Sequence, residues 1–246
     1  MKARGEAWLR SRLRAIPLLR AARSRFSATA RREARDDERL RQLLAYVLDE
    51  DSNCIDVGAH RGGVLEHIVR LAPRGRHIAF EPLAELCAEL RERFPGADVR
   101  ESALSNERGK RTFVFVQNHP ALSGFRRRDY PSAPVAREIS VEVDRLDDSL
   151  PASYVPALIK IDVEGAEREV LEGALETIAR HRPVVVFEHG KGAAPHYGTQ
   201  PRDLYSLLCD RAGLRIFDLD GNGPFALPEL ERIFERGDRW NFVAHR

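Results

Sequence analysis

The sequence predicts an α/β fold in which helices cover both faces of a mostly parallel sheet. Short apolar runs rich in Val and Ile end at a glycine or an acidic residue. They alternate with segments whose apolar residues recur at helical spacing, and the alternation has the length of parallel crossover units. The apolar share of 43% over 246 residues suits a globular protein of one domain with an appendage.

The parallel-type strands number about seven, which favours a single doubly wound sheet. They are predicted at 53–57, 77–80, 97–100, 158–162, 184–188, 214–217 and 241–244. Two alternating runs, 111–117 and 138–143, predict further strands, and a helix is predicted at 36–49. One helix is expected through Ala166 to Ile178 and another from Pro201 to Arg211. Because ligands of such sheets bind beyond the carboxyl ends of the strands, the functional residues are expected at those ends.

Residues 1–35 form a basic N-terminal extension that precedes a domain at 36–246. The extension holds eleven Lys or Arg against Glu6 and Glu33, so the rest of the chain carries a net charge of −7. The mildly acidic body argues against a nucleic-acid partner. Three interpretations of the extension stay open. It is an organellar transit peptide, a helix through residues 1–25 that touches an anionic membrane surface, or an appendage that binds nothing.

Composition also predicts a cytoplasmic location, with peripheral membrane contact left open. No run approaches the roughly 20 apolar residues that span a bilayer, and no secretory leader is evident. The three cysteines, Cys54, Cys87 and Cys209, lack a metal-like spacing and read as buried thiols of a reducing compartment. Nothing in the sequence indicates the oligomeric state.

A glycine loop with the pattern Asp56-x-Gly58-x-x-x-Gly62 follows the first predicted strand. Glycine at 58 permits a sharp turn and close approach of a ligand to the backbone. The loop is not the G-x-G-x-x-G of dinucleotide sites. A carboxylate at Asp56 would repel a pyrophosphate but would pair with an ammonium group, which suits S-adenosylmethionine. The alternative is an acidic strand end with turn glycines.

Glu81 ends the second predicted strand and is followed by Pro82. A carboxylate at this place accepts hydrogen bonds from both hydroxyls of a ribose. Together with the glycine loop it predicts an adenosine-type ligand, whereas alone it reads as an exposed carboxylate.

The most distinctive string is Leu158-Ile-Lys-Ile-Asp-Val-Glu-Gly-Ala-Glu167. Asp162 and Glu164 are expected to face the crevice above the sheet. There a carboxylate would stabilise a sulfonium charge, hold a substrate hydroxyl or bind a metal, and without a third ligand we predict no metal site. Glu167 suits the dipole at the start of a helix.

Glu188 and His189 end the strand after that helix, and His189 is the residue type best suited to take a proton near neutral pH. His60, His119 and His196 compete for the role of base. The run Arg126-Arg127-Arg128 reads either as a solvated loop or as a recognition site for an acidic substrate.

These motifs together resemble the FkbM family of S-adenosylmethionine-dependent methyltransferases. The resemblance rests on D-V-G-A-H-R-G at 56–62, F-E-P at 80–82, A-L-S at 103–105, I-K-I-D-V-E-G-A-E at 159–167 and V-L-E-G-A at 170–174. It covers roughly residues 50–190. It implies a Rossmann-like, seven-stranded class I methyltransferase fold whose members mostly methylate hydroxyl oxygens of small natural products and sugars.

The resemblance also implies roles for residues of the motifs. The cofactor contacts would come from the loop 56–62 and from the strand ends near the ribose and adenine; they are Asp56, Gly58, Ala59, His60, Gly62, Glu81, Pro82, Ser102, Ala103 and Asp162. Asp162 would lie near the methyl group. His60 stands where an asparagine is common, and the segment 118–136 has no transferable pattern.

The sequence therefore predicts a methyltransferase that acts on a hydroxyl of a small molecule or glycan, with Asp162, Glu188 and His189 as catalytic candidates. Methylation of nitrogen on the same scaffold and a non-catalytic cofactor-binding module are the alternatives. A nicotinamide-dependent reductase is disfavoured by the missing G-x-G-x-x-G and by Asp56.

Overall fold

A computed structural model describes residues 28–130 and 133–246, which fall into two units divided after Leu40. In the first unit, residues 28–40 are helical, and Arg32 pairs with Asp36 at 2.8 Å between Nη2 and Oδ1. The sequence places the domain boundary after residue 35. The predictions for residues 1–25 lie outside the described residues.

The second unit begins with helical residues 41–47 and then alternates strands and helices. Its strands are β1 (Cys54–Val57), β2 (Ile78–Phe80), β3 (Asp98–Arg100), β4 (Ala103–Leu104), β5 (Gly109–Val116), β6 (Ala136–Asp144), β7 (Leu158–Ile161), β8 (Val184–Glu188), β9 (Arg215–Asp218) and β10 (Asn241–His245). Its helices are α2 (Gly63–Leu71), α3 (Ala84–Arg93), α4 (Leu146–Ser149), α5 (Glu167–Gly173), α6 (Leu175–His181), α7 (Pro201–Tyr205) and α8 (Leu227–Arg236), with short turns η1 (Pro120–Leu122), η2 (Ala194–Tyr197) and η3 (Ser206–Arg211).

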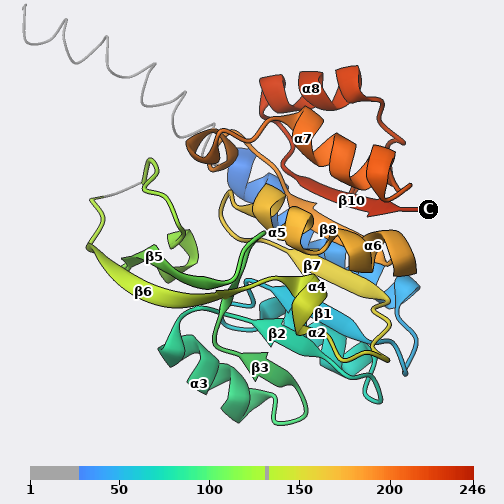
Figure 1. The fold of residues 1–246 in the computed structure, drawn as a ribbon. Coiled ribbons are helices and arrows are strands. Elements are labelled where there is room, and N and C mark those ends of the chain that lie inside the picture. Colours follow the sequence, from blue (N-terminus) through green and yellow to red (C-terminus); the bar gives the residue numbers. More distant parts are fainter. Residues whose placement is uncertain (1–27, 131–132) are drawn as a thin grey trace, which may run out of the picture. The chain divides into compact units, whose positions relative to one another are not determined.

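Seven strands form one sheet in the order β3-β2-β1-β7-β8-β10-β9 (Figure 1). The pairs from β3 through β8 are parallel, whereas β10 runs antiparallel to both β8 and β9. The chain moves outward from β1 to β3 and then returns to the other side of β1 as β7. The strand order therefore reverses between β1 and β7, which is where a crevice opens above such a sheet. The predicted seven-stranded, doubly wound fold is confirmed.

Strand alternation sorts the side chains to the two faces of the sheet. Ile55 and Val57 of β1, with Ile159 and Ile161 of β7, join the large core under α5, α6 and η3. On the other face, Ala79 of β2 packs among residues of α2 and α3, such as Leu65 and Leu90. Asp56 and Lys160 alternate with the Ile and Val side chains and are direct partners in the register of β1 and β7. The two buried charges therefore meet on the face away from the large core.

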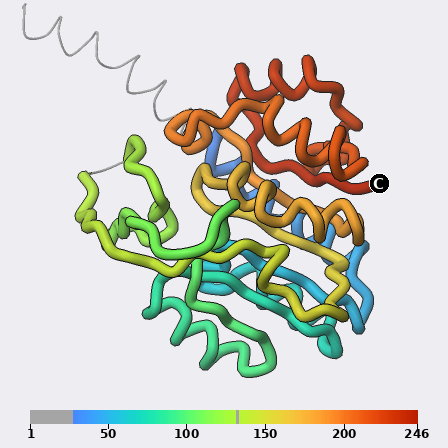
Figure 2. Tube along the Cα trace, in the orientation of Figure 1, coloured from blue at the N-terminus to red at the C-terminus, as the bar shows by residue number. Residues whose placement is uncertain are grey.

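A second, three-stranded sheet in the order β4-β6-β5 carries the runs that the sequence predicts at 111–117 and 138–143. β5 and β6 pair antiparallel from Gly109↔Val143 to Val116↔Ala136, and Figure 1 shows this hairpin beside the main sheet. The segment between β5 and β6, which we call the hairpin segment, folds back on β5, because Val114 and Gly124 exchange two backbone hydrogen bonds of 2.8 and 3.2 Å. Figure 2 follows the chain through this excursion between β3 and β7.

Three local features differ from the predicted helices. The expected helix through Ala166 to Ile178 is divided at Ala174 into α5 and α6. The expected helix from Pro201 to Arg211 ends in a π-helical turn, η3. The amphipathic α8, which buries Leu230, Ile233 and Phe234, is an element that the prediction omitted. Among the described residues, no helix is both long and apolar enough to cross a bilayer.

Candidate active site

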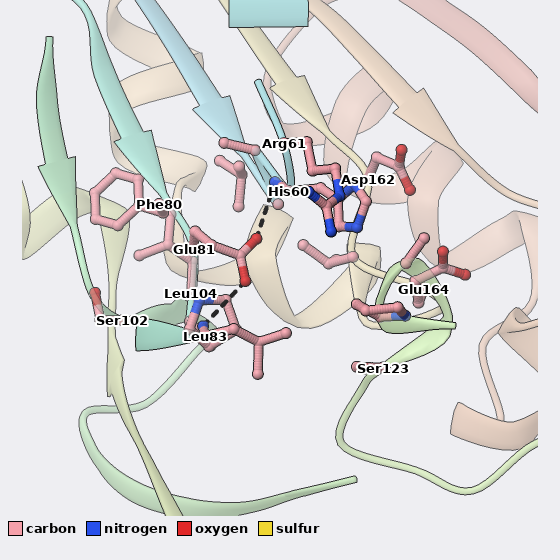
Figure 3. Close-up of a pocket in the computed structure, with 18 of the residues that line it drawn as sticks. His60, Arg61, Phe80, Glu81, Leu83, Ser102, Leu104, Ser123, Asp162 and Glu164 are labelled. Atoms are coloured by element: carbon pink, nitrogen blue, oxygen red, sulfur yellow. Dashed lines mark hydrogen bonds between the residues drawn. The ribbon is translucent and has the colours of Figure 1, made fainter. Parts of the chain in front are cut away.

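A cavity of about 240 Å³ opens beyond the carboxyl ends of β1, β2 and β7, close to the size of small-molecule sites. Its lining comes from strand ends, from the start of α2 and from the hairpin segment: Val57, Gly58, Ala59, His60, Arg61, Gly63, Val64, Phe80, Glu81, Pro82, Leu83, Ser102, Ala103, Leu104, Phe113, Pro120, Ala121, Ser123, Phe125, Lys160, Asp162, Val163 and Glu164. In Figure 3, Glu81, Leu83 and Ser102 stand on one side, and Asp162, Glu164 and Ser123 stand opposite. We call these the β2 side and the β7 side.

Gly58 makes the turn that leaves β1 for the cavity. Its φ is +74°, a conformation that L side chains rarely adopt. Its N–H donates to the carbonyl of Phe80 at 2.9 Å, which ties the turn to β2. A Cβ at this position would lie 2.0 Å from the carbonyl oxygen of Asp162. Only glycine therefore lets β1 and β7 come together beneath the cavity.

Glu81 is held on the β2 side by the backbone. Oε2 accepts from the N–H of His60 at 2.9 Å and Oε1 from the N–H of Leu83 at 3.0 Å (Figure 3). The residue is 4% exposed. Burial raises the pKa of its carboxyl group to about 7, although the two amides lower it. The side chain thus has one fixed orientation and titrates near neutral pH.

The rest of the β2 side is apolar except for one hydroxyl group. The hydroxyl of Ser102 is buried and has no hydrogen-bond partner among the described residues. Leu83, Leu104 and Phe113 line the cavity around it, and Phe113 meets Phe125 edge to face with ring centroids 5.6 Å apart. This side offers a flat apolar slot with one unused hydroxyl.

The floor of the cavity holds a buried ion pair. Nζ of Lys160 lies 3.3 Å from Oδ1 of Asp56 and 3.6 Å from Oδ2 of Asp162, and it donates to the carbonyl of Gly58 at 2.9 Å. Burial lowers the pKa of Lys160, but the carboxylates, Asp56 foremost, outweigh it and leave the pKa raised. Burial raises the pKa of Asp56 against the opposing effect of Lys160. Lys160 is therefore charged and offsets part of the negative charge of the carboxylates around it.

The β7 side is acidic and carries a strained turn. Glu164 has φ +60°, which is uncommon for a residue other than glycine. Its Oε2 pairs with Nη2 of Arg128 at 2.6 Å, and these side chains are 20% and 10% exposed. Arg128 lies in the segment between β5 and β6, so the hairpin segment is tied to the end of β7.

The similarity of this chain to a known protein family agrees with this geometry. The model of the methyltransferase FkbM domain matches residues 56–215. The chain belongs to the FkbM methyltransferase family. The predicted family is thereby confirmed, and the matched region contains every strand end that lines the cavity.

Two curated relatives match part of the chain. The 2-O-methyltransferase NoeI of Sinorhizobium fredii strain NGR234 is 29% identical over 163 residues, which is 58% of this chain and 65% of NoeI. The methyltransferase sdnD of Sordaria araneosa is 28% identical over 156 residues, which is 50% of this chain and 60% of sdnD. The chain thus spans less than two thirds of either relative.

Among solved structures, the methyltransferase FkbM from Methylobacillus flagellatus KT is similar with a TM-score of 0.51 at 16% identity. The match covers 81% of this chain and 44% of that chain. At this identity the likeness concerns the fold.

Within this FkbM domain, most of the predicted cofactor-binding residues come together. Those that line the cavity are Gly58, Ala59, His60, Glu81, Pro82, Ser102, Ala103 and Asp162. Gly62, with φ +77°, is the N-cap of α2 and does not line the cavity, and a Cβ there would overlap Leu90 and Phe94 at the end of α3. Asp56 does not line the cavity: it is 1% exposed, and Lys160, its partner in the register of β1 and β7, lies against it. This is a difference from the expected direct contact with a cofactor ammonium group.

Glu188 and His189 do not line the cavity, in contrast to the role in catalysis that the sequence suggests. Burial and the nearby charges of Asp162 and Glu164 raise the pKa of Glu188 well above its usual range. The ring of His189 stacks on Phe234 of α8, with centroids 4.8 Å apart, and is 2% exposed. Burial lowers its pKa to about 4, so it is neutral at pH 7.

The other three candidate histidines differ in their position relative to the cavity. His60 lines the cavity, whereas His119 and His196 do not. Burial, followed by the charges of Arg61 and Lys160, lowers the pKa of His60. Of the four histidines that the sequence offered as bases, only His60 reaches the cavity.

Lys160 and the hairpin residues were not among the predicted site residues. Lys160 had a usable signal, because it is a lone charge within a buried strand, two positions before Asp162 and therefore on the same face. Phe113, Ser123 and Phe125 had none, since their place over the cavity depends on the tertiary return of the hairpin. Two residues of the run Arg126–Arg128 form ion pairs within the protein: Arg127 lies 3.6 Å from Glu138, and Arg128 pairs with Glu164.

Proposed function

We propose that the chain binds S-adenosylmethionine in this cavity and transfers its methyl group to a hydroxyl oxygen of a small natural product or glycan. The observation that carries the proposal is the buried carboxylate of Glu81 beside the Gly58 turn. Each of its oxygens accepts one backbone N–H, and a carboxylate oxygen has room for a second donor. Two ribose hydroxyls would supply those donors.

The surroundings of Glu81 fit the remainder of an adenosyl group. The unpaired hydroxyl of Ser102 supplies a hydrogen bond within a slot whose apolar walls, Leu83 and Leu104, suit a flat aromatic base. Asp162 and Glu164 at the opposite end supply negative charge for a sulfonium group. Asp56 would act through Lys160, which it holds beneath the Gly58 turn.

In this proposal the cofactor supplies a methyl group that is already activated, and the protein aligns the reactants and excludes water. Asp162 borders the reacting centre from the end of β7. Glu188 does not line the cavity, and burial favours its neutral form, so we assign it no direct part in the transfer. We assign His189 to packing against Phe234, because a ring with that environment has no route to the acceptor.

Oxygen is favoured as the accepting atom by the name of the relative NoeI, a 2-O-methyltransferase. The acidic β7 side also suits an uncharged, hydroxylated acceptor better than an anionic one, because like charges within a partly buried site repel. Arg128 is already paired with Glu164, so it does not offer a free cation to an acidic substrate.

Calorimetry with S-adenosylhomocysteine, the demethylated product of the cofactor, tests the proposal. We expect binding by the wild type and a loss of about 30-fold in Glu81→Ala, since hydrogen bonds to a charged group contribute about 2 kcal/mol. Glu85→Ala, an exposed carboxylate at the start of α3, is the matched control and should bind like the wild type. Equal affinity in Glu81→Ala and Glu85→Ala would refute the ribose assignment. Labelled S-adenosylmethionine with a panel of saccharides and other hydroxylated acceptors then tests transfer.

A further inference from the structure

Glu164 is the carboxylate that faces the reacting end of the cavity from the β7 side. It lines the cavity together with Asp162 and stands near Ser123 in Figure 3. Its carboxylate is bound at one oxygen by Arg128, 2.6 Å away. Among the described residues, the other oxygen, Oε1, has no hydrogen-bond or ion-pair partner, so it is available to a ligand.

The backbone around Glu164 is fixed in a tight turn. Oε1 of Glu167 accepts the N–H groups of Val163 and Gly165, each at 3.1 Å. A Cβ on Gly165 would overlap the ring of Tyr197, at 2.7 Å. The φ of +60° at Glu164 is therefore imposed by its neighbours, and strain held in this way is concentrated at functional sites.

Charges from every element packed around Glu164 act on it. The groups concerned are Asp162 at the end of β7, Arg128 of the hairpin segment, and the carboxyl groups of Glu167 of α5 and Glu188 of β8, whose own pKa values are raised by burial. Burial, then the charge of Asp162, raises the pKa of Glu164 to about 8, while Arg128 lowers it. A general base is most effective when its pKa lies near the working pH.

We propose that Glu164 is the catalytic base that accepts the proton of the acceptor hydroxyl, and that Arg128 is the positioning residue that holds its carboxylate against the cavity. The inference rests on the proposed function. A lone pair of the acceptor oxygen forms the new bond to the methyl carbon, and the bond from that carbon to sulfur breaks with its electron pair left on sulfur. The hydroxyl proton passes to the free oxygen of Glu164, so the positive charge of the donor and the negative charge of the carboxylate disappear together.

The two other carboxylates at this end are less suited to the step. Asp162 lies 3.6 Å from the ammonium group of Lys160, so one of its oxygens already pairs with a cation on the floor of the cavity. Glu188 does not line the cavity. Glu164 combines a place on the cavity wall with a carboxylate whose orientation is held by Arg128.

The test compares two cofactor analogues that differ chiefly at the position of the transferred methyl group. Sinefungin is a cofactor analogue that carries an amine where the cofactor carries its S-methyl group, and S-adenosylhomocysteine carries nothing there. If Glu164 faces the transferred group, the wild type should prefer sinefungin, and Glu164→Gln should reduce this preference by about tenfold through loss of a charge-assisted hydrogen bond. Its affinity for S-adenosylhomocysteine should stay within about threefold of the wild type, which also shows that the variant is folded. Glu176→Gln, an exposed carboxylate on α6, is the matched control.

A second test measures the protons that the wild type releases when it binds each ligand. Calorimetry at pH 7.5 in two buffers of different ionisation enthalpy should show that cationic S-adenosylmethionine releases more protons on binding than neutral S-adenosylhomocysteine, because the cation favours the ionised carboxylate. The difference should vanish in Glu164→Gln. With an acceptor from the panel, that variant should lose at least about a hundredfold in kcat, a larger effect than its change in KM for the cofactor.

Each result decides between the two proposals. An unchanged probe preference in Glu164→Gln, or equal proton release by the two ligands, would overturn the role of Glu164 and leave the cofactor site standing. If the folded wild type bound neither S-adenosylhomocysteine nor sinefungin, the proposed function itself would fail.

Discussion

The two sides of the cavity are built by different means. On the β2 side, the carboxylate of Glu81 accepts two backbone N–H groups, and the Gly58 turn donates its own N–H to β2. On the β7 side, side-chain contacts between distant segments, such as Arg128 with Glu164, tie the hairpin segment to the end of β7. Backbone contacts follow from the sheet, whereas the side-chain contacts depend on the residues of one insertion. This division suits a protein that keeps one cofactor and adapts its acceptor.

The largest expected effect breaks the β2 side at Gly58. In Gly58→Ala the new Cβ would meet the carbonyl of Asp162 at 2.0 Å in a backbone of φ +74°. Strain of this kind costs about 2–4 kcal/mol. We expect a lower melting temperature and a loss of at least about a hundredfold in affinity for S-adenosylhomocysteine.

Gly63→Ala provides the control for that substitution. Gly63 also lines the cavity, but a Cβ there meets nothing within 4 Å. It should bind S-adenosylhomocysteine like the wild type in the same calorimetric titration. Equal affinities in Gly58→Ala and Gly63→Ala would show that the close approach of β1 and β7 is not needed for binding.

The β2 side could be predicted from the sequence because its geometry is local. A glycine after a buried strand predicts a turn at Gly58, and a carboxylate at the end of the next strand predicts Glu81 beside it. Parallel neighbours bring such ends together whatever the rest of the chain does. The contact of Asp56 with Lys160 could not be predicted in this way, because it depends on the register in which β7 returns beside β1.

The β7 side could not be predicted in the same way. The segment 117–135 has no periodicity, and its position depends on the bonds of Val114 with Gly124 and on Tyr197, which follows its partner Arg126 by 71 residues. The sequence placed Glu188 and His189 at a strand end, which is correct, but α8 covers His189 through Phe234. Because α8 itself was not predicted, its packing on His189 had no signal in the sequence.

A second prediction sharpens the comparison through pH. Burial raises the pKa of Glu81 to about 7, and hydroxyl donors of a bound ribose favour the ionised carboxylate, so binding lowers that pKa. Affinity for S-adenosylhomocysteine should therefore increase about tenfold from pH 6 to pH 8 and level off above the pKa of the free protein. Titrations at five pH values measure this.

Glu81→Gln should remove most of the pH dependence, because the amide does not titrate. Glu164→Gln should leave it in place, since S-adenosylhomocysteine lacks the sulfonium charge that Glu164 is proposed to face. A flat profile in the wild type would mean that Glu81 keeps the same proton in the free and bound states, contrary to the proposed contact.

The smallest expected effect concerns the attachment of the hairpin segment. The hydroxyl of Tyr197 accepts the backbone N–H of Arg126 at 3.2 Å, while its ring packs against Gly165. Tyr197→Phe keeps the ring and removes one hydrogen bond, which contributes about 1 kcal/mol. Limited trypsin digestion, followed by mass spectrometry of peptides ending at residues 126–128, should show cleavage accelerated about fivefold. Tyr46→Phe, at a 91% exposed position, should leave the rate unchanged. Affinity for S-adenosylhomocysteine should also stay unchanged in Tyr197→Phe, because the β2 side holds the ligand without this bond. A parallel loss of affinity would mean that the two sides form a single cooperative unit.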